Sequence, residues 1–302
     1  MRIGTNAFFR HITQTVNQSE TDLGRLTVKL SSGKRIQYAS EDPLGSQIIS
    51  RAKTTAASAQ ARVRTLQQGV RLCLQTDVAL ASIAGWLQEA TELASSATQS
   101  IGATEAVRQT AAASIRSARD AMLQAANSMS GDRYLLSGYQ DRTEPFQEVA
   151  GVVVYNGDSG QLTAPLGSGR TVPIAIAGDR VFNFDGGVPG IGNAFQVLDD
   201  LATAIETGDI PTARNLTDNV SALFSHVTTL RGSIGTYQVR LEANISVLEE
   251  IQLRCNEVLA DEESLDLAGA ITEYTAKETA YTALLSVFSR VMSMANLFDL
   301  TR

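Results

Sequence analysis

The sequence has little of the chemistry on which enzymes and metal proteins usually depend. Its 302 residues include two cysteines, two histidines and one tryptophan, and aromatic residues make up only 6%. Neither Cys73 nor Cys255 has a second cysteine or a histidine close to it in the sequence, so no zinc or redox motif is present. His11 and His226 are equally isolated, and no nucleophile, base and orienting group form a recognisable pattern. We therefore expect no catalytic residues, no cofactor and no metal site.

Long apolar stretches and basic clusters are scarce as well. No uninterrupted apolar run approaches the roughly 18 residues of a membrane-spanning helix, and residues 1–6 lack the apolar core of a cleaved secretory signal. The chain carries 25 basic and 32 acidic residues, a net charge of −7, without a run of basic residues. This balance argues against nucleic acid and membranes as partners.

What the sequence does contain is apolar residues at alternating steps of three and four, the spacing of a helix packed along one seam. Near the N-terminus Ser19 fills the one polar slot of such a stripe. Its apolar members are Phe9, Ile12, Val16, Leu23, Leu26 and Leu30. A single helix with so narrow a seam is not stable in water, so we expect it to need a partner helix.

Two longer stripes cover residues 44–101 and roughly 210–260, and each is longer than a helix of a compact domain needs to be. Because they are similar in length, we expect the two helices to lie antiparallel. Gly69 and Gly85 interrupt the first of these helices. Since glycine there lowers helix stability by roughly 1 kcal/mol relative to alanine, these positions predict a close approach of another backbone.

Between the two long stripes, residues 131–192 differ in composition from the rest. They hold twelve of the 23 glycines and four of the six prolines. Short β-branched runs separated by turn residues predict a small β domain here. The predicted strands are Val152–Tyr155, Thr171–Val172, Ile174–Ile176 and Val181–Phe184. Shorter helices are expected on either side, at residues 104–129 and from residue 193.

The C-terminal segment predicts a helix with a broader apolar face than the first one. An acidic hinge at residues 261–266 has the composition of a helix start, and the seam of the following helix is polar only at Glu278. Its apolar members are Ile271, Tyr274, Tyr281, Leu285, Phe288 and Met292. Residues 1–40 carry a net charge of +4 and residues 257–302 one of −5. We therefore expect the two terminal helices to attract each other and pair, although each exposed ion pair is worth under about 1 kcal/mol.

These patterns predict a mainly α protein with a small inserted β domain, arranged as an elongated antiparallel helical bundle or coiled coil whose N- and C-terminal helices pair. Three parts are expected. Residues 1–43 and 261–302 form a terminal coiled-coil domain, residues 44–130 and 193–260 form a helical rod, and residues 131–192 form the β domain.

The joint between the first two helices is the most distinctive segment of the chain. Gly33 can end the first helix in the left-handed conformation, and Pro43 suits the first turn of the next helix. Arg35 and Asp42, with the charged residues beside them, predict salt bridges. These could cross the joint or reach a neighbouring subunit, and the spacing leaves both alternatives open.

This joint resembles the corresponding segment of bacterial flagellins. The residues that carry the resemblance are Leu30, Ser31, Ser32, Gly33, Arg35, Ile36, Asp42 and Gly45. The stretch Gln238–Glu242 is also similar to flagellins. Within the family, Arg133–Gly138 followed by Pro145–Phe146, and the ending Leu297–Leu300, resemble the branch of hook–filament junction proteins.

The resemblance implies a structural subunit of the bacterial flagellum with a flagellin-like fold. Proteins of this branch are exported unfolded through the flagellar type III channel and are secreted to the hook–filament junction. There they form a short ring whose partners are further copies, the hook-side junction protein and flagellin, and their paired terminal helices line the inner tube of the polymer. An export chaperone covers the C-terminal stripe in the cytoplasm. By this resemblance, the chaperone contact would involve Tyr281, Leu285, Phe288 and Met292.

Two other functions stay open at this point. A short flagellin, which is the filament subunit itself, would share the joint and both helical arms. A coiled-coil adaptor unrelated to motility would share only the helical pattern. In any polymer-forming subunit with this thin N-terminal seam, we expect the terminal helices to order only on polymerisation, because ordering entropy cancels the gain from burial.

Overall fold

The computed structural model describes residues 2–99, 104–167 and 169–300, and within these ranges the side chains from Arg10 to Arg290. The chain forms two compact units. The first unit consists of Met1–Ala59 with Glu250–Arg302, and the second of Gln60–Glu249. Helices α2 (Pro43–Gln99) and α6 (Ile210–Glu263) contribute to both units. The three domains expected from the sequence therefore remain a prediction.

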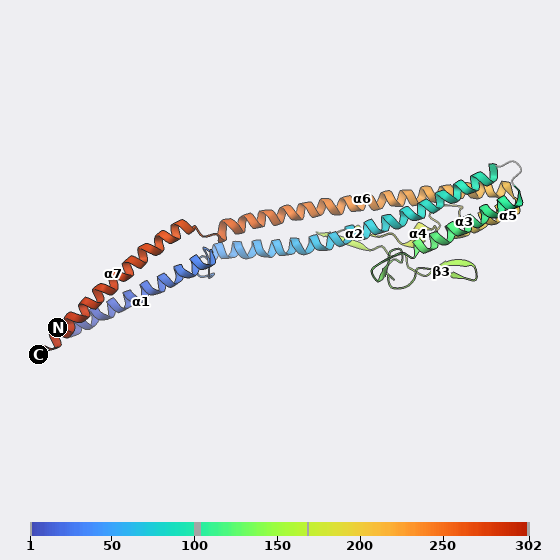
Figure 1. Ribbon diagram of the computed structural model, residues 1–302. Coiled ribbons are helices and arrows are strands. Elements are labelled where there is room, and N and C mark those ends of the chain that lie inside the picture. Colours follow the sequence, from blue (N-terminus) through green and yellow to red (C-terminus); the bar gives the residue numbers. More distant parts are fainter. Residues whose placement is uncertain (1, 100–103, 168, 301–302) are drawn as a thin grey trace. The chain divides into compact units, whose positions relative to one another are not determined.

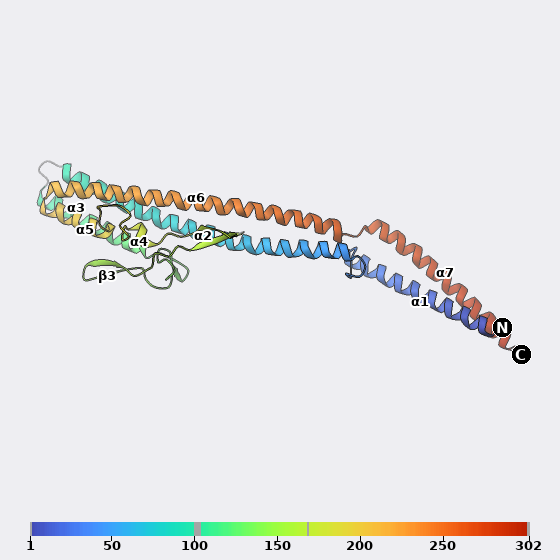
Figure 2. The same cartoon turned by 180° about the vertical axis from the view of Figure 1, so that it is seen from behind.

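In the first unit, the N-terminal helix α1 (Arg2–Ser32) and the C-terminal helix α7 (Leu267–Leu300) lie side by side, as both views show (Figures 1 and 2). They run antiparallel, and Lys277 Nζ of α7 lies 4.0 Å from Asp22 Oδ2 of α1. This ion pair has the opposite polarity to the one that the net charges of the two ends predict. The expected pairing of the terminal helices is confirmed.

The predicted stripe of α1 forms the least exposed face of that helix. Leu26 is buried, and the remaining described members are half-buried, namely Ile12, Val16, Leu23 and Leu30. The side chain of Phe9 lies outside the described residues. The part that these residues play in assembly stays a prediction.

The predicted seam of α7 is wrong at two positions. Ile271 is 53% exposed and Leu285 is 39% exposed. The less exposed face is formed by Ala270, Tyr274, Lys277, Tyr281, Leu284 and Phe288. Both faces carry apolar residues, so spacing alone did not distinguish them, and the helix rotates to place the neighbours of Ile271 and Leu285 inward. Met292 belongs to the side chains that are not described.

The second unit contains a continuous apolar core along the facing sides of α2 and α6. Its members include Val63, Leu66, Leu80, Ile83 and Leu87 from α2, and Val220, Leu223, Val227, Ile234 and Leu241 from α6. Arg231 of α6 donates two hydrogen bonds to Asp77 of α2, at 3.0 and 3.3 Å. Leu241 packs at Gly69, so residue numbers rise along α2 as they fall along α6, which confirms the antiparallel arrangement of the two helices within the unit.

Helices α3 (Glu105–Ala126) and α5 (Ala194–Thr207) pack against each other in the same unit (Figure 1). The residues that they bury include Ile115, Met122, Leu198 and Leu201. Arg119 of α3 is almost fully buried, and its guanidinium pairs with Asp199 of α5 at 3.3 Å and with Glu148 at 3.2 Å. Because these partners hold its charge, they keep the pKa of Arg119 raised although burial acts to lower it.

The two glycines inside α2 behave differently. A Cβ atom on Gly69 would lie 3.2 Å from Ile174 Cγ2 and 3.4 Å from Leu241 Cδ1, so this position is held open for close side-chain packing. Gly85 has no atom within 4 Å of the place of a Cβ among the described residues. The atoms nearest to Gly69 belong to side chains, and no described atom is near Gly85, so the predicted close approach of another backbone is wrong at both positions.

The insert between α3 and α5 contains three separate antiparallel hairpins. They pair β1 (Met129–Ser130) with β2 (Arg133–Tyr134), β3 (Phe146–Val149) with β4 (Val152–Tyr155), and β5 (Thr163–Gly167) with β6 (Arg170–Pro173). The strand expected at Val152–Tyr155 is confirmed, and Thr171–Val172 lies within β6. The strand expected at Ile174–Ile176 is wrong, because these residues form an irregular segment after β6.

The strand expected at Val181–Phe184 is also wrong, because this segment begins in a short helix, α4 (Gly178–Val181). The amide of Phe182 donates to the Gly178 carbonyl at 3.1 Å, which closes the turn. Asn183 follows with a positive φ of 62°. Its side chain donates to the Ile191 carbonyl at 2.8 Å and accepts from the Val188 amide at 2.6 Å, and these bonds stabilise the bend.

An aromatic cluster holds the insert together. Phe146 of β3 packs edge-on to Phe182, with ring centroids 4.8 Å apart, and Phe182 lies 4.7 Å from Phe195 of α5. Tyr155 and Phe184 complete the cluster. Such ring pairs add about 0.5–1.5 kcal/mol each beyond the area that they bury.

Both cysteines are free thiols. Cys73 of α2 is fully buried, and its Sγ lies 3.5 Å from the Ile174 carbonyl oxygen. Burial raises the pKa of this thiol to about 11. Cys255 of α6 is half-buried.

By length and composition alone, α2 could cross a membrane, because an 18-residue window within it reaches a mean hydropathy of 1.2. This value is a mean over the window, and the sequence of α2 contains no uninterrupted apolar run of that length. The window is 39% buried within the protein. Packing of a core helix accounts for the same composition.

Candidate assembly site

The joint after α1 lies against a second helix break, between α6 and α7. Gly33 ends α1 with a φ of +67°. The amide of Arg35 donates to the Glu263 carbonyl at 2.8 Å, and the amide of Leu265 donates to the Gly33 carbonyl at 3.1 Å. Together with the antiparallel bridge between Lys34 and Ser264, these bonds join the two breaks as a minimal two-stranded pair.

Arg35 links three parts of this joint through its side chain. Its guanidinium binds Glu262 Oε2 at 2.7 Å and Asp42 Oδ2 at 3.1 Å, and Nε donates to the Glu262 carbonyl at 3.1 Å. Beside it, Lys29 lies 3.4 Å from Glu41, and Lys53 pairs with Glu263. The alternative in which these charges bridge the joint is therefore confirmed. All of these side chains are partly exposed, so each pair is worth under about 1 kcal/mol.

Asp42 and Gly45 set the start of α2, which begins at Pro43 as the sequence predicts. The Gly45 amide donates to Asp42 Oδ1 at 2.9 Å, the geometry of an N-terminal helix cap. Gly45 is buried, and a Cβ there would lie 2.5 Å from Asp42 Oδ2 and 2.6 Å from Ile36 Cδ1. A side chain at residue 45 would therefore displace the carboxylate that caps the helix and binds Arg35.

The hydrogen bonds of the joint lower the pKa of two carboxylates. For Asp42, the main causes are the Gly45 amide and then the Arg35 guanidinium. For Glu41, the main cause is the amide of Gln37, at 3.0 Å, followed by the charge of Lys29. The ionised form of each group is the one that the joint stabilises.

The remaining residues of the joint motif are placed around this centre. Leu30 and Ile36 are half-buried, whereas Ser31 and Ser32 are exposed. The Ser32 hydroxyl donates to the Lys29 carbonyl at 3.2 Å and accepts from the Lys34 amide at 3.3 Å, which supports the end of α1.

Beyond the joint, α7 has exposed apolar side chains on both flanks of its less exposed face. Ile271 and Leu285 lie on one flank, and Val287 lies on the other. Tyr281 and Phe288 are half-buried on the less exposed face. The stripe predicted for assembly and chaperone contact is thus divided between half-buried and exposed positions.

The segment Arg133–Gly138 lies in the core of the insert. Leu136 is buried, and its carbonyl accepts from the Gly178 amide at 2.8 Å and from the Tyr155 hydroxyl at 3.1 Å. Gly138 has a φ of +73°, and a Cβ there would lie 2.2 Å from Asp158 Oδ1. Phe146 is held by its amide, which donates to Asn127 Oδ1 at 3.0 Å. The motif therefore fixes the fold of the insert.

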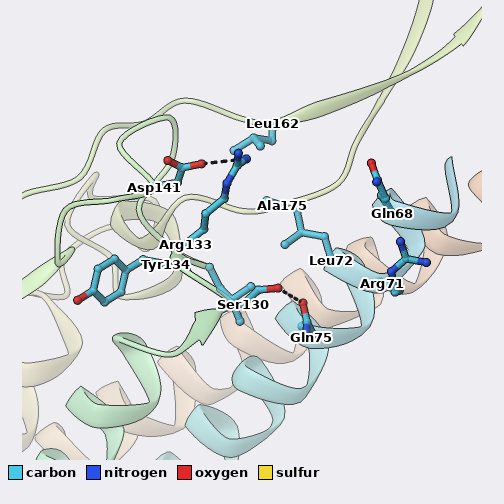
Figure 3. A pocket seen from close by; sticks show the side chains of 11 residues that line it. Gln68, Arg71, Leu72, Gln75, Ser130, Arg133, Tyr134, Asp141, Leu162 and Ala175 are labelled. Carbon is cyan, nitrogen blue, oxygen red and sulfur yellow. Dashed lines mark hydrogen bonds and ion pairs between the residues drawn. The ribbon is translucent and has the colours of Figure 1, made fainter. Parts of the chain in front are cut away.

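A cavity of about 270 Å³ separates this segment from α2 (Figure 3). Gln68, Arg71 and Gln75 approach it from the helix, and Arg133 and Asp141 form an ion pair of 3.2 Å on the opposite side. Ser130 Oγ donates to Gln75 Oε1 at 2.5 Å across it. No cluster of metal-ligating side chains occurs among the described residues. The cavity is a gap between insert and helix that is lined by apolar side chains, such as Leu72 and Leu162, as well as by polar ones.

Comparison with known proteins places the joint in a family. Residues 3–141 match the family model of the bacterial flagellin N-terminal helical region. Flagellar hook-associated protein 3 of Escherichia coli (strain K12) is 25% identical over 325 aligned residues, which cover 100% of both chains. The N-terminal part of the chain, including the joint, is thus similar to bacterial flagellins, and the whole chain is similar to hook-associated protein 3.

Solved structures of the family share this fold. FlgL of Xanthomonas campestris has a TM-score of 0.59 at 18% identity, with 70% of this chain and 99% of that chain covered. The flagellar junction protein FlgL of Legionella pneumophila has a TM-score of 0.58 at 15% identity, with 72% and 100% covered. The flagellin-like fold expected from the joint motif is thus confirmed.

Sequence reasoning missed the partners of the joint. Glu262, Ser264 and Leu265 make its backbone and ion-pair contacts, although they lie about 230 residues further along the chain. The acidic composition of residues 261–266 pointed only to a hinge. The opposite charges of Arg35 and Glu262 were the one available signal that the two breaks meet.

Proposed function

We propose that the protein is a structural subunit of the bacterial flagellum that joins the hook to the filament. The single observation that carries this proposal is the end-to-end correspondence with hook-associated protein 3. The matched length includes the insert with Arg133–Gly138 and Pro145–Phe146. A resemblance confined to the helical arms would have favoured the family in general over this branch.

The architecture of the first unit supports a role in a polymer. Its two terminal helices pair through a thin seam, and α7 leaves Ile271 and Leu285 exposed on one flank and Val287 on the other. A surface of this kind gains stability when further copies pack against it. We infer that the partners are copies of the chain in a ring, the hook-side junction protein and flagellin, and that the chain is secreted through the flagellar type III channel.

Locating the protein in isolated flagella tests this proposal. Antibody or dye labelling is expected to mark a single band where the hook meets the filament, and deletion of the gene is expected to release unpolymerised flagellin into the medium. Label along the whole filament would instead identify a short flagellin. Absence of the chain from flagella, with motility unchanged by the deletion, would identify a coiled-coil adaptor unrelated to motility.

We also propose that an export chaperone binds the C-terminal stripe before secretion. Deletion of residues 270–302 is expected to abolish that binding, as measured by calorimetry with the purified chaperone. Leu285→Lys is expected to weaken it at least about tenfold, because the substitution places a charge on an apolar contact. Val239→Lys, on an exposed position of α6 in the second unit, is the matched control. Unchanged affinity after the deletion contradicts the proposal.

A further inference from the structure

A groove of about 700 Å³ in the second unit gathers positive charge. It lies between the β5–β6 hairpin and the helices α2 and α6. Arg62 enters it from α2, Arg170 from the hairpin and Arg240 from α6. No aspartate or glutamate is found among the described residues that line it. Three guanidinium groups from three elements therefore converge on one open site.

These three arginines lack the carboxylate partners that other arginines of the chain have. Arg35, Arg119 and Arg231 each pair with an acidic side chain at 3.3 Å or less. Within the part of the chain that the structure describes, Arg62, Arg170 and Arg240 form no ion pair. Unpaired arginine side chains in a groove are suited to bind a carboxylate through two parallel hydrogen bonds.

The groove also has features that hold its shape. Gly167 adopts a φ of +102°, and a Cβ there would lie 3.0 Å from Arg62 Nη1. The glycine thus leaves room for the guanidinium at the tip of the hairpin. Asn244, on the α6 side of the groove, has a buried Oδ1 without a hydrogen-bond partner in the described structure. The Nδ2 group of the same amide carries two N–H donors, from which a carboxylate that enters the groove can accept.

The distribution of charge along α2 indicates what that molecule is. Between Pro43 and Thr76 the helix carries five basic residues and no acidic one, whereas from Asp77 to Gln99 it carries three acidic residues and no basic one. Glu89 and Glu92 are exposed in the second part. Neither forms an ion pair among the described side chains, and Glu92 only accepts a hydrogen bond from Gln88, at 2.9 Å. The second unit thus presents a basic groove without carboxylate partners, and two glutamates, Glu89 and Glu92, without basic partners.

We propose that the groove binds Glu89 and Glu92 of a neighbouring copy of this chain. The two patches lie on different parts of α2, about 40–45 Å apart along the helix. A contact between unlike patches of identical chains is heterologous, and repetition of it builds rings or helical assemblies rather than closed pairs. The inference rests on the proposed function, since it assigns the residues through which one copy meets the next in the flagellum.

Site-specific photocrosslinking in assembled flagella tests the contact. A photoreactive amino acid replaces Thr171, an exposed residue that lines the groove, in cells whose own copy of the gene is deleted. Irradiated flagella are expected to contain a product of two copies, with the crosslinked peptide from the region around residues 89–92. The triple variant R62E/R170E/R240E is expected to lower the yield at least tenfold. Arg64→Glu, an exposed arginine of α2 outside the groove, is expected to leave it unchanged.

A charge-exchange variant makes the test specific. Combining R62E/R170E/R240E with E89R/E92R is expected to restore the crosslink to at least half of its original yield. Crosslinks only to flagellin or to another protein, or an equal yield in the triple variant, overturn the inference while leaving the proposed function intact. If the unsubstituted chain is absent from flagella, the proposed function fails, and the inference fails with it.

Discussion

The two units of the molecule differ in how completely they bury their side chains. Among the described residues, the twelve largest fully buried side chains, which include Phe146, Leu66 and Met122, all belong to the second unit. In the described part of the first unit, the buried apolar residues are small or near the limit of burial, as with Leu26 at 8% and Ala270 at 5% exposure. The second unit has an apolar core of its own, whereas in the first unit α1 and α7 meet along a half-buried seam.

This difference indicates which unit depends on neighbours. Full burial of a large apolar side chain contributes about 1.5–3 kcal/mol, whereas ordering one residue costs about 1–2 kcal/mol of backbone entropy. The half-buried seam of α1 and α7 does not offset that cost alone. We infer that the second unit is stable in the free subunit and that the terminal helices order when other copies cover them.

Truncation of one phenylalanine in each unit should give the largest contrast. Phe195→Ala removes a ring that is 1% exposed and packs on Phe182 at 4.7 Å, so we expect a loss of about 3–5 kcal/mol in the free energy of unfolding. Phe288→Ala, on the half-buried face of α7, is expected to cost under about 1 kcal/mol in the purified chain. Urea denaturation followed by circular dichroism measures both. Equal losses would contradict the comparison.

Amide exchange should separate the units without any substitution. Residues 10–30 of α1 are expected to exchange roughly 100-fold faster than residues 112–126 of α3 in dilute monomer, because exchange follows local opening. Hydrogen–deuterium exchange with mass spectrometry gives both rates, and assembled flagella serve as the control in which α1 becomes protected. Strong protection of α1 in the monomer would show that its seam is sufficient.

Substitution of the glycines of α2 by alanine should change the stability less, and it tests how densely the core is packed. Gly85→Ala is expected to stabilise the chain by about 1 kcal/mol, since alanine favours the helix and no described atom lies near the new methyl group. Gly69→Ala is the matched variant and is expected to bring no gain, because the methyl group meets Ile174 and Leu241. Thermal unfolding measures both. An increase in thermal stability on Gly69→Ala would mean that Ile174 and Leu241 pack less closely around residue 69 than their distances indicate.

Acidification should affect the joint and the buried Asp179 with opposite sign, and this effect should be the smallest. The pKa values of Asp42 and Glu41 are lowered in the folded protein, so the ionised carboxylates stabilise the joint at pH values above their ordinary pKa values of 3.8 and 4.5. This stabilisation is lost as the pH falls through the pKa values of the folded state. Burial raises the pKa of Asp179 in the second unit, so its folded form favours the proton and gains stability as the pH falls.

Amide exchange rates are measured at pH 6 and pH 3 and corrected for their intrinsic pH dependence. From pH 6 to pH 3, the corrected rates at the joint are expected to rise relative to those of residues 178–182. The variant Asp42→Asn should reduce the change at the joint, since the titrating carboxylate is gone. A joint that keeps its protection at pH 3 would contradict the assigned role of these two groups.

The helical part of the fold was predictable because its apolar spacing is local and regular. The α1 stripe around Leu26 and the start of α2 at Pro43 follow from the sequence. The face of α7 did not, because Ile271 and Leu285 stand next to the equally plausible Ala270 and Leu284, and only contact with another helix decides between them.

The insert and the joint were harder for different reasons. Strand β5 contains Pro165 and ends at Gly167, residues that argue against a strand, so its hairpin was not expected. The short helix at Val181 depends on tertiary bonds of Asn183 rather than on local preference. The joint residues Gly33, Arg35 and Asp42 were found by resemblance, but their contact with Glu262 is long-range and has no local signature.

The two thiols give the protein a built-in selectivity toward alkylating reagents. Cys73 is enclosed by the core and keeps its proton up to about pH 11, so maleimides reach it only after the second unit opens. Cys255, half-buried on α6 in the first unit, is the accessible one. A fluorescent dye can therefore be attached to the unsubstituted chain at a single place, close to the break between α6 and α7, where it would report directly on docking of the terminal helices.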